Sequence, residues 1–419
     1  LLGDVPWLEV DLNVDSEELY GPKMKRNQVF QKIIEDLDFA IQWLPEAGSE
    51  EANRLNKDIA RHVKARFCLN EGTHYKYHDE LEYASEAEKW LQMAATESDK
   101  LITSGRYEIY NTGHPQEDYF NMYRIDDKSD LKEAVLYVDY KTNIREHNMA
   151  AAGREAGCGF SKSFVESFLC SDGLPISLSN KYLGDETMRK ETANRDPRLK
   201  QLILTNDFPT NVTDDLKDST FVVNEDEFIT QHCFTGYRPI KGFNPIYSQA
   251  LYMKSSFDGI AYRYAETLLI NAEAKAELNT ITNADLDRTV NQLRDRVGMP
   301  HLTVNVGFTD PKWPDWGYSL SPVLQEIRRE RCIELAGEGF RFNDLKRWKA
   351  GKLLNNVLTY VGKRKPDGNL AIVYPNYTNP DLSYQAGKSR TWEDKMYLYP
   401  IPTGELQRNP QLLPQNPGW

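Results

Sequence analysis

Cysteine is scarce in this sequence of 419 residues, and long apolar runs are missing from it. Its cysteines are Cys68, Cys158, Cys170, Cys233 and Cys332. None belongs to a C-x-x-C pair, and an odd number leaves at least one thiol unpaired, so we expect buried or inert thiols rather than a disulfide framework. No apolar run approaches the roughly 18–20 residues that span a bilayer, so the visible chain is not expected to cross a membrane.

Basic residues are also in deficit. The chain has 63 Asp and Glu against 51 Lys and Arg, which gives a formal net charge of −12. Non-specific binding to nucleic acid depends on clustered Lys and Arg that neutralise phosphates, so no nucleic-acid partner is expected. A neutral or cationic partner fits this charge better. The first ten residues have no initiator Met, basic segment or apolar segment, and we interpret this start as internal to a longer protein.

The familiar enzyme motifs are missing as well. The sequence has no G-x-x-x-x-G-K-[ST] loop, no G-x-G-x-x-G turn, no G-x-S-x-G elbow and no H-E-x-x-H pair. We therefore predict no catalytic residue and no cofactor.

The nearest approach to a metal site is HYKYH, where His74 and His78 are four residues apart and precede Asp79 and Glu80. This segment follows Gly72, where we expect a helix to end, and two histidines without a third ligand are more typical of a protein surface. The acidic segments YRIDDKSDLKE and NEDEF offer carboxylates for a structural Ca²⁺ ion or a glycosidase pair. Carboxylates are so abundant that neither is favoured. No metal site is predicted, and a structural Ca²⁺ ion stays an open alternative.

Helical periodicity dominates the first hundred residues. One apolar stripe with three- and four-residue spacing runs through Val29, Ile33, Leu37, Ile41 and Leu44. It predicts a helix over about 27–44 that Pro45 ends. Similar patterns predict helices over 56–72 and 84–102. We therefore predict an N-terminal helical part over 1–103, built from consecutive antiparallel helices.

The chain from 104 to 259 has a different texture, with short apolar runs, aromatics and frequent glycine and proline, which predicts an irregular, loop-rich region. Helices return over 260–419. One is expected to end near Asn279 and a second to span about Asn283 to Val297. Alanines on the inner faces let helix axes approach closely, as in a tetratricopeptide-like stack, although the full repeat consensus is absent. The predicted fold class is mostly α, an α–α superhelix of such helix pairs plus the loop-rich region.

Aromatic residues gather in two proline-containing loops. Trp313, Trp316 and Tyr318 lie in KWPDWGYS. Tyr237, Phe243 and Tyr247 lie in GYRPIKGFNPIY. Rings held by stiff loops suit sugar recognition, because a pyranose presents an apolar C–H face while its hydroxyls bond to nearby polar groups. Packing of the loops onto the helices is the alternative for each ring. We take all six residues as ligand-binding candidates.

The segment ERCIELAGEGFRFNDLKRW, residues 330–348, is dense in charge. Ser321 is suited to cap the helix that leads into it, and the glycines at 337 and 339 weaken or end that helix. Asn343 or Asp344 would then cap a shorter helix that ends near Gly351.

This pattern predicts a helical corner. We expect Arg341 or Arg347 to fold back onto Glu334 or Glu338. Such an ion pair specifies geometry more than it adds stability, so the corner is interpreted as scaffold.

The same segment closely resembles the C-terminal signature of the SusD/RagB family, the surface nutrient-binding lipoproteins of Bacteroidetes-type bacteria. Other segments agree with that family in order. They are GDVPW at 3–7, DLDFAIQWLP at 36–45, FVESFLCSDGLPI at 164–176, RDPRL at 195–199, YRYAETLLINAEAKAEL at 262–278, VNQLRDRVG at 290–298 and the closing YLYPIPTGELQRNPQLLPQNPGW at 397–419. The resemblance covers nearly the whole chain.

The resemblance implies a SusD-like fold in which four tetratricopeptide-like helix pairs support a loop-rich ligand-binding region. It implies an outward-facing protein, lipid-anchored on the outer membrane, that delivers glycan to a SusC-like TonB-dependent transporter and performs no catalysis. Family chains carry a signal peptide, a lipidated Cys and a first helical pair before the GDVP position, so the lipid anchor is not expected within this sequence. The structural signature falls on Glu334, Glu338, Arg341, Asp344, Arg347 and Trp348.

Three alternatives stay open. Some members of the family take peptides, so the ligand of this chain could be a peptide or another nutrient. A glycoside hydrolase on a helical scaffold would need two carboxyl groups about 5–10 Å apart across an aromatic-lined cleft. A helical-repeat adaptor that binds protein would show an apolar concave groove without a sugar-sized aromatic platform.

Overall fold

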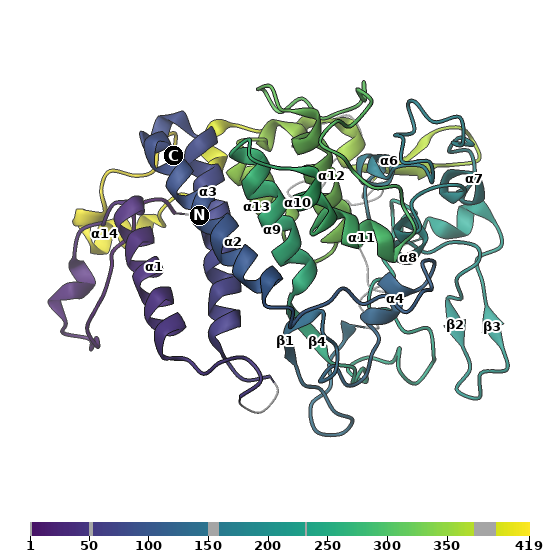
Figure 1. Cartoon of the computed structure of the whole chain (residues 1–419), viewed down its shortest axis with the longest axis horizontal. Helices are drawn as coiled ribbons and strands as arrows, with labels where there is room; N and C mark the ends of the chain where they lie inside the picture. Colours follow the sequence, from purple (N-terminus) through teal and green to yellow (C-terminus); the bar gives the residue numbers. More distant parts are fainter. Residues whose placement is uncertain (1, 50–52, 150–158, 231–232, 373–390) are drawn as a thin grey trace.

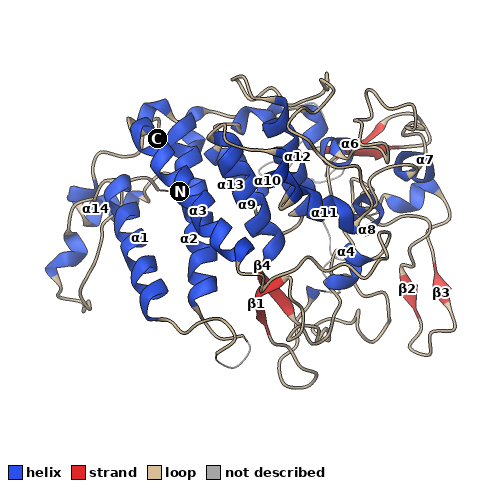
Figure 2. Cartoon of the chain, viewed as in Figure 1, coloured by secondary structure: helices blue, strands red, loops and turns tan. Residues whose placement is uncertain are grey.

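The computed structural model of the chain describes residues 2–49, 53–149, 159–230, 233–372 and 391–419. Helices dominate these residues, which confirms the mostly α fold class (Figures 1 and 2). The α-helices are α1 (Arg26–Trp43), α2 (Lys57–Tyr77), α3 (Ala87–Thr103), α4 (Asp118–Met122), α6 (Lys162–Ser167), α7 (Met188–Thr192), α8 (Arg198–Leu202), α9 (Tyr264–Glu277), α10 (Asn283–Asp287), α11 (Val290–Arg296), α12 (Pro322–Glu334), α13 (Arg341–Arg347) and α14 (Thr403–Arg408). Short 3-10 helices span Glu17–Tyr20, Asp79–Leu81, Ala84–Glu86, Glu225–Phe228, Gly351–Asn355, Val357–Thr359, Asp394–Tyr397 and Pro410–Leu412.

The strands form small antiparallel sheets of two strands each. They pair as β1 (Ala134–Val138) with β4 (Gly259–Arg263), β2 (Asn211–Val212) with β3 (Ser219–Thr220), and β5 (Val361–Arg364) with β6 (Leu370–Ile372). Among the described residues, no helix is long and apolar enough to cross a membrane. The cysteines at 68, 170, 233 and 332 are free thiols, and the first three are buried, while Cys158 lies outside the described residues.

The long helices pack side by side (Figure 1). Helix α3 packs against both α2 and α9, α9 packs against α12, and α1 packs against α2. The shared core combines aromatic with small side chains, including Phe30 of α1, Ala65 and Leu69 of α2, Trp90 and Ala94 of α3, and Ala274 of α9. Small residues at these positions allow the close approach of helix axes that the alanine pattern predicts.

The predicted end of α2 at Gly72 is wrong, because the helix continues to Tyr77. Gly72 serves helix packing instead. A Cβ atom at this position would lie 2.9 Å from the Cγ atom of Leu91 on α3, so only glycine lets the two helices approach this closely. The C-cap of the helix is His78, whose backbone leaves the helical region (φ −108°, ψ 73°).

The single helix predicted over 283–297 is two helices, α10 and α11. Thr282 caps α10 in a capping box with Asp285. Thr289 then interrupts the helix with φ −130° and ψ −97°, and its hydroxyl donates a hydrogen bond to the Asp285 carbonyl (2.6 Å). The predictions for α1, α3 and α9 are confirmed to within a few residues.

The region from 104 to 259 is irregular, as the sequence predicts, and packs around a core to which residues beyond 259 also contribute. This core contains Tyr119, Val165, Phe168, Leu199, Leu202, Tyr237 and Ile333, among others. It is joined to the helical stack by the β1–β4 sheet, since β4 leads directly into α9. The predicted boundary at 259–260 falls inside β4.

Candidate functional site

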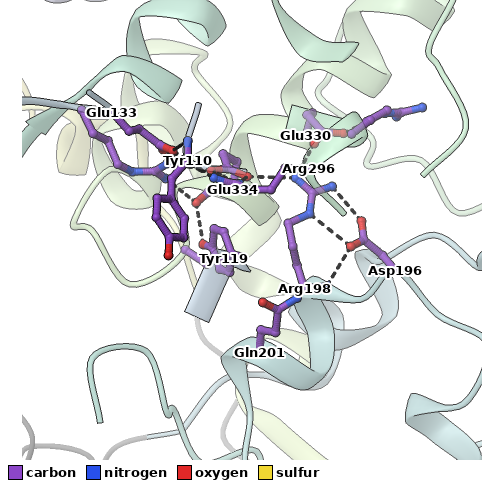
Figure 3. A network of polar contacts seen from close by, with 12 residues as sticks. Tyr110, Tyr119, Glu133, Asp196, Arg198, Gln201, Arg296, Glu330 and Glu334 are labelled. Atoms are coloured by element: carbon purple, nitrogen blue, oxygen red, sulfur yellow. Dashed lines mark hydrogen bonds and ion pairs between the residues drawn. The ribbon is translucent and has the colours of Figure 1, made fainter. Parts of the chain in front are cut away.

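Glu334, at the end of α12, lies at the centre of a buried network of charges (Figure 3). Its carboxylate accepts hydrogen bonds from Arg263 (2.6 Å), Arg296 (2.7 Å) and Arg198 (3.0 Å), which come from β4, α11 and α8. These arginines also contact other carboxylates, namely Glu133, Asp196, Glu330 and Glu338. Burial by itself raises the pKa of Glu334, but the three arginines outweigh it and hold that pKa well below its ordinary value.

The corner that follows α12 has different ion pairs from those predicted. Arg341 and Arg347 do not pair with Glu334 or Glu338. Arg347 forms two hydrogen bonds to Glu273 of α9 (2.6 and 2.7 Å). Glu338 pairs with Arg263 (2.7 Å) instead. The predicted partners are close in sequence, but the corner is fastened by residues far along the chain, because α12 and α13 each pack against α9 or α2 rather than only against each other.

The remaining signature residues complete this corner. The Asp344 carboxylate accepts hydrogen bonds from Arg331 and from Arg347 (both 2.9 Å). Trp348 is fully buried, and its indole N–H donates to Glu273 (2.7 Å). Arg341 places its guanidinium carbon 6.0 Å from the centre of the Trp348 ring. The corner is therefore a rigid support for the loops around it.

The aromatic loop at 313–318 is held against this support. Trp316 is only 6% exposed, meets Trp348 edge-on with ring centres 5.4 Å apart, and donates its indole N–H to Gln325 (2.6 Å). Trp313 is half-buried and donates its indole N–H to Glu326 (2.7 Å). For Trp316 the packing alternative is the correct one, because no ring face is left for a ligand.

The second predicted aromatic group is mostly core. Tyr237 is fully buried and its hydroxyl donates to Glu191 (2.8 Å), and Phe243 packs in the core of the irregular region. Both are removed from the ligand-binding candidates, because a ligand cannot reach a buried ring. Tyr247 is 52% exposed and stays a candidate.

Tyr318, the last residue of the aromatic loop, stacks on Tyr77 at the end of α2. Their ring centres are 4.4 Å apart and the ring planes differ by 18°. A hollow of about 400 Å³ opens beside this pair. Its lining also includes Lys76, Asp79 and Asn279, which bring an ammonium, a carboxylate and an amide next to the rings.

Hydrogen bonds fix the orientation of both tyrosines. The Tyr77 hydroxyl donates to the carboxylate of Glu277 (2.6 Å), and the Tyr318 hydroxyl donates to the Trp348 carbonyl. Arg328 donates to the Tyr318 hydroxyl oxygen (3.1 Å). Burial raises the pKa of Tyr318 to about 12, so this phenol keeps its proton and its hydrogen bond at neutral pH. The ring pair is thus preorganised before any ligand arrives.

A larger cleft, of about 1050 Å³, is lined by α1, α2, the corner at 337–347 and loops near 240 and 258. His74 of α2 reaches this cleft, and its ring lies 4.0 Å from that of His78, centre to centre. Both histidines are buried, so the prediction of surface residues is wrong. Burial lowers the pKa of each, most strongly for His74, which keeps both rings neutral near pH 7. The helix extension to Tyr77 is what carries them into the interior.

Within the part of the chain that the structure describes, no group of three or more His, Cys, Asp and Glu residues is arranged to hold a metal ion. His78 uses both ring nitrogens otherwise, contacting Glu80 and the Lys346 carbonyl (both 2.8 Å).

Comparison with known proteins shows which family has this architecture. A model of the SusD family matches residues 97–419. The chain belongs to the SusD family. This agrees with the ordered motifs of the sequence and confirms the resemblance on which they were interpreted.

Several known proteins are similar to this SusD-family chain. It is 24% identical over 432 residues to SusD-like protein P2 of Formosa agariphila, in a match that covers 100% of this chain and 70% of the relative. A SusD-like protein of Bacteroides fragilis has a TM-score of 0.72 at 24% identity, with 100% of this chain and 76% of that one covered. A SusD-like carbohydrate-binding protein of the same organism has a TM-score of 0.69 at 22% identity, with coverages of 98% and 76%. A surface glycan-binding protein A of Bacteroides fluxus has a TM-score of 0.56 at 17% identity, with coverages of 100% and 74%. These likenesses establish a SusD-like fold.

Sequence reasoning missed Tyr77 in this SusD-family protein. The residue lies inside HYKYH, which the sequence offers only as a weak metal-site pattern of two histidines. Because the helix was predicted to end at Gly72, Tyr77 was not placed on α2. A count of helical turns beyond Gly72 would have placed Tyr77 on the helix. No local signal links it to Tyr318, because the two are far apart in the sequence and are joined in the fold by their ring contact and by hydrogen bonds through Glu277 and Arg328.

Proposed function

We propose that this SusD-family protein is a surface glycan-binding protein, and that it captures oligosaccharide or polysaccharide without cleaving it. The observation that carries the proposal is the preorganised Tyr77–Tyr318 pair beside a hollow that also presents Lys76, Asp79 and Asn279. Rings fixed in orientation offer a face for sugar C–H groups, and the flanking polar groups suit sugar hydroxyls. Similar proteins described as carbohydrate-binding or glycan-binding support this ligand class.

The test is loss of the ring at Tyr318. Tyr318→Ala should weaken binding of a neutral oligosaccharide by about tenfold, because it removes one member of the platform. Tyr318→Phe keeps the ring and should bind within a few-fold of wild type. Tyr252, which is 73% exposed and does not line the hollow, supplies the control Tyr252→Ala. Isothermal titration calorimetry on variants with unchanged circular dichroism gives the affinities, and equal binding by Tyr318→Ala and wild type would reject this site.

Trp313 and Tyr247 are the other ring candidates. If Tyr318→Ala leaves glycan affinity unchanged, Trp313→Ala and Tyr247→Ala test the two other rings in turn. A peptide library in place of the glycan tests the alternative nutrient class. Affinity for peptides but for no glycan would change the proposed ligand, not the role in uptake.

A non-enzymatic role is supported by the state of the carboxylates. Among the described residues that line the hollow, Asp79 is the only carboxylate, whereas a glycosidase needs a pair and an acid with a raised pKa. In the larger cleft, Arg263 and Lys241 hold the pKa of Glu338 below the ordinary value despite burial, and Arg331 and Arg347 do the same for Asp344. Incubation with a bound polysaccharide should release no reducing sugar, and release that survives repurification would overturn this part of the proposal.

The protein acts, in this proposal, on the outer face of the outer membrane, where a lipid anchor holds it. There it hands glycan to a SusC-like TonB-dependent transporter. Family membership is the support for this partnership. Affinity purification of the full-length protein from outer membranes should recover such a transporter in near-equal amount. Recovery of the protein in the soluble periplasmic fraction, without a transporter, would contradict it.

A further inference from the structure

Arg328 of α12 lies next to the Tyr77–Tyr318 hollow but does not line it. The residue is 1% exposed, and its guanidinium carbon lies 5.1 Å from the centre of the Tyr77 ring and 5.8 Å from that of the Tyr318 ring. The same carbon lies 4.7 Å from the centre of the Trp316 ring and 4.4 Å from that of the Trp348 ring. One buried cation therefore contacts four aromatic rings, two of which form the proposed sugar platform.

Hydrogen bonds connect Arg328 to the hydroxyls of both tyrosines. Arg328 donates one hydrogen bond to the Tyr318 hydroxyl oxygen (3.1 Å) and another to the Glu277 carboxylate (2.9 Å). The second oxygen of this carboxylate accepts a hydrogen bond from the Tyr77 hydroxyl (2.6 Å). Glu277, the last residue of α9, is also buried and does not line the hollow. Both hydroxyls are therefore held by one buried ion pair that joins α9 to α12.

The two tyrosines come from separate parts of the chain, so they need a common anchor to keep their place in the hollow. Tyr77 is the last residue of α2, and Tyr318 lies in the loop before α12. Stacking, with ring centres 4.4 Å apart, fixes the rings relative to each other but not relative to the rest of the hollow. The planar guanidinium of arginine donates to two acceptors at once in a fixed geometry, which is how Arg328 holds a carboxylate and a phenol together.

We propose that Arg328 and Glu277 are positioning residues of the glycan site. They hold the stacked rings in the orientation that a sugar needs, and neither touches the ligand, since neither lines the hollow. Each tyrosine hydroxyl is one anchor for the pair, so loss of one leaves the stack held by the other, and loss of both releases it. Released rings must be ordered again when a sugar binds, which weakens affinity. This inference rests on the proposed glycan-binding function and adds the residues that set its affinity.

The experiment removes the anchors and keeps the rings. Tyr77→Phe and Tyr318→Phe should each weaken oligosaccharide binding by at most about twofold, and the double variant Tyr77→Phe/Tyr318→Phe by about tenfold. Isothermal titration calorimetry with cellohexaose, maltohexaose and laminarihexaose gives the affinities, which are compared for whichever of these wild type binds most tightly. Arg328 and Glu277 still pair in the double variant, so no buried charge loses its partner. A loss in the double variant no larger than the product of the two single losses would overturn the proposal.

A matched double variant separates anchoring from a general loss of buried hydrogen bonds. The Tyr119 hydroxyl donates to the Glu334 carbonyl (2.7 Å), and the Tyr237 hydroxyl donates to the Glu191 carboxylate (2.8 Å). Both tyrosines are fully buried, and neither lines the hollow. Tyr119→Phe/Tyr237→Phe should lower the urea midpoint of unfolding and leave oligosaccharide affinity unchanged. An equal loss of affinity in this control would mean that binding only follows the overall stability of the fold, and the proposal would be wrong.

Arg328→Lys tests the arginine itself. Lysine keeps the positive charge beside Glu277, but one ammonium cannot reproduce the fork that donates to the carboxylate and to the Tyr318 hydroxyl. The substitution should weaken oligosaccharide binding about fivefold in wild type and cause no further loss in the Tyr77→Phe/Tyr318→Phe variant, where no hydroxyl is left to hold. A purely structural role predicts a lower unfolding midpoint with unchanged affinity per folded molecule, and that result would reject a positioning role. If Arg328→Lys does not fold, the double phenylalanine variant decides.

Failure of this inference and failure of the proposed function give different results. If Tyr318→Ala binds the hexasaccharides as wild type does, the hollow is not the glycan site, and both proposals fall. If Tyr318→Ala weakens binding and the double phenylalanine variant does not, the hollow stays the glycan site and only the positioning role of Arg328 and Glu277 is rejected.

Discussion

Glu334 offers the sharpest test of the scaffold interpretation. Glu334→Gln preserves the shape of the side chain and removes its charge from a network in which three arginines donate to it. Breaking a buried ion pair by removing one partner costs about 3–5 kcal/mol. Each arginine keeps at least one other carboxylate, for example Glu133 for Arg296 and Asp196 for Arg198. We therefore expect a loss at the lower end, about 3 kcal/mol of unfolding free energy.

Urea denaturation measures this loss. The midpoint should fall while the slope with denaturant stays unchanged, because the same surface is exposed on unfolding. The control is Glu108→Gln, which breaks an ion pair with Lys132 whose side chains are both about 60% exposed, and which should leave the midpoint unchanged. Glycan affinity per folded molecule should be that of wild type. A loss below about 1 kcal/mol, or selective loss of glycan binding, would refute the reasoning.

The pH dependence gives an independent check with a definite sign. The folded-state pKa of Glu334 is depressed below that of an unfolded glutamate, about 4.3. Its ionised form therefore stabilises the fold above that pH, and this contribution is lost as pH falls toward the folded-state pKa. The stability gap between wild type and Glu334→Gln should narrow as pH is lowered from about 5 to about 3. A gap that stays constant over this range would mean that the charge is not responsible.

Two further predictions concern packing and capping. Gly362 in β5 is so close to the Thr235 backbone that an added Cβ would lie 2.0 Å from the Thr235 carbonyl oxygen, so Gly362→Ala should strongly lower the melting temperature. The control is Gly404→Ala, which should leave the melting temperature unchanged because a Cβ there meets nothing within 4 Å. Equal effects of the two substitutions would contradict the packing argument. The Asn56 side chain caps α2 by accepting hydrogen bonds from the N–H groups of residues 58 and 59. Asn56→Ala should therefore lower the free energy of unfolding, measured by urea denaturation, by about 1 kcal/mol, and Asn56→Gly should lower it by only a few tenths of a kcal/mol. Similar losses for both would mean that the cap is not what stabilises α2.

The periodic parts of the fold were predictable from sequence, and the site largely was not. The apolar stripe from Val29 to Leu44 specifies α1 because a surface helix needs only one buried face. The predicted end of α2 was wrong because a glycine in a local pattern favours the end of a helix. Position 72 instead needs glycine because of its close contact with Leu91, 19 residues further along the chain. Pairings such as Tyr77 with Tyr318 depend on tertiary packing, which no local pattern encodes.

The aromatic candidates show that sequence also does not determine which rings are exposed. The composition of the loops around 237–247 and 313–318 correctly marks where rings gather, but sequence does not say which ring faces water. Trp316 and Tyr237 are the residues that fasten these loops, and Tyr318 and Tyr247 are those with accessible surface or a neighbouring hollow. Lys346 illustrates the reverse case, since a lysine in a charged segment is expected at the surface, whereas the structure buries it with its ammonium over the Phe342 and Tyr399 rings.

The arginines around Glu334 have a consequence for how the chain folds. Arg198 and Glu334 are 136 residues apart, and Arg263 and Arg296 lie between them in sequence. None of these charges can be desolvated at low cost until the irregular region and the C-terminal helices have met, so we expect the network to form late in folding. The irregular region and the helical stack should therefore open as one cooperative unit, with amide protons of α8 and α12 losing protection from hydrogen exchange together.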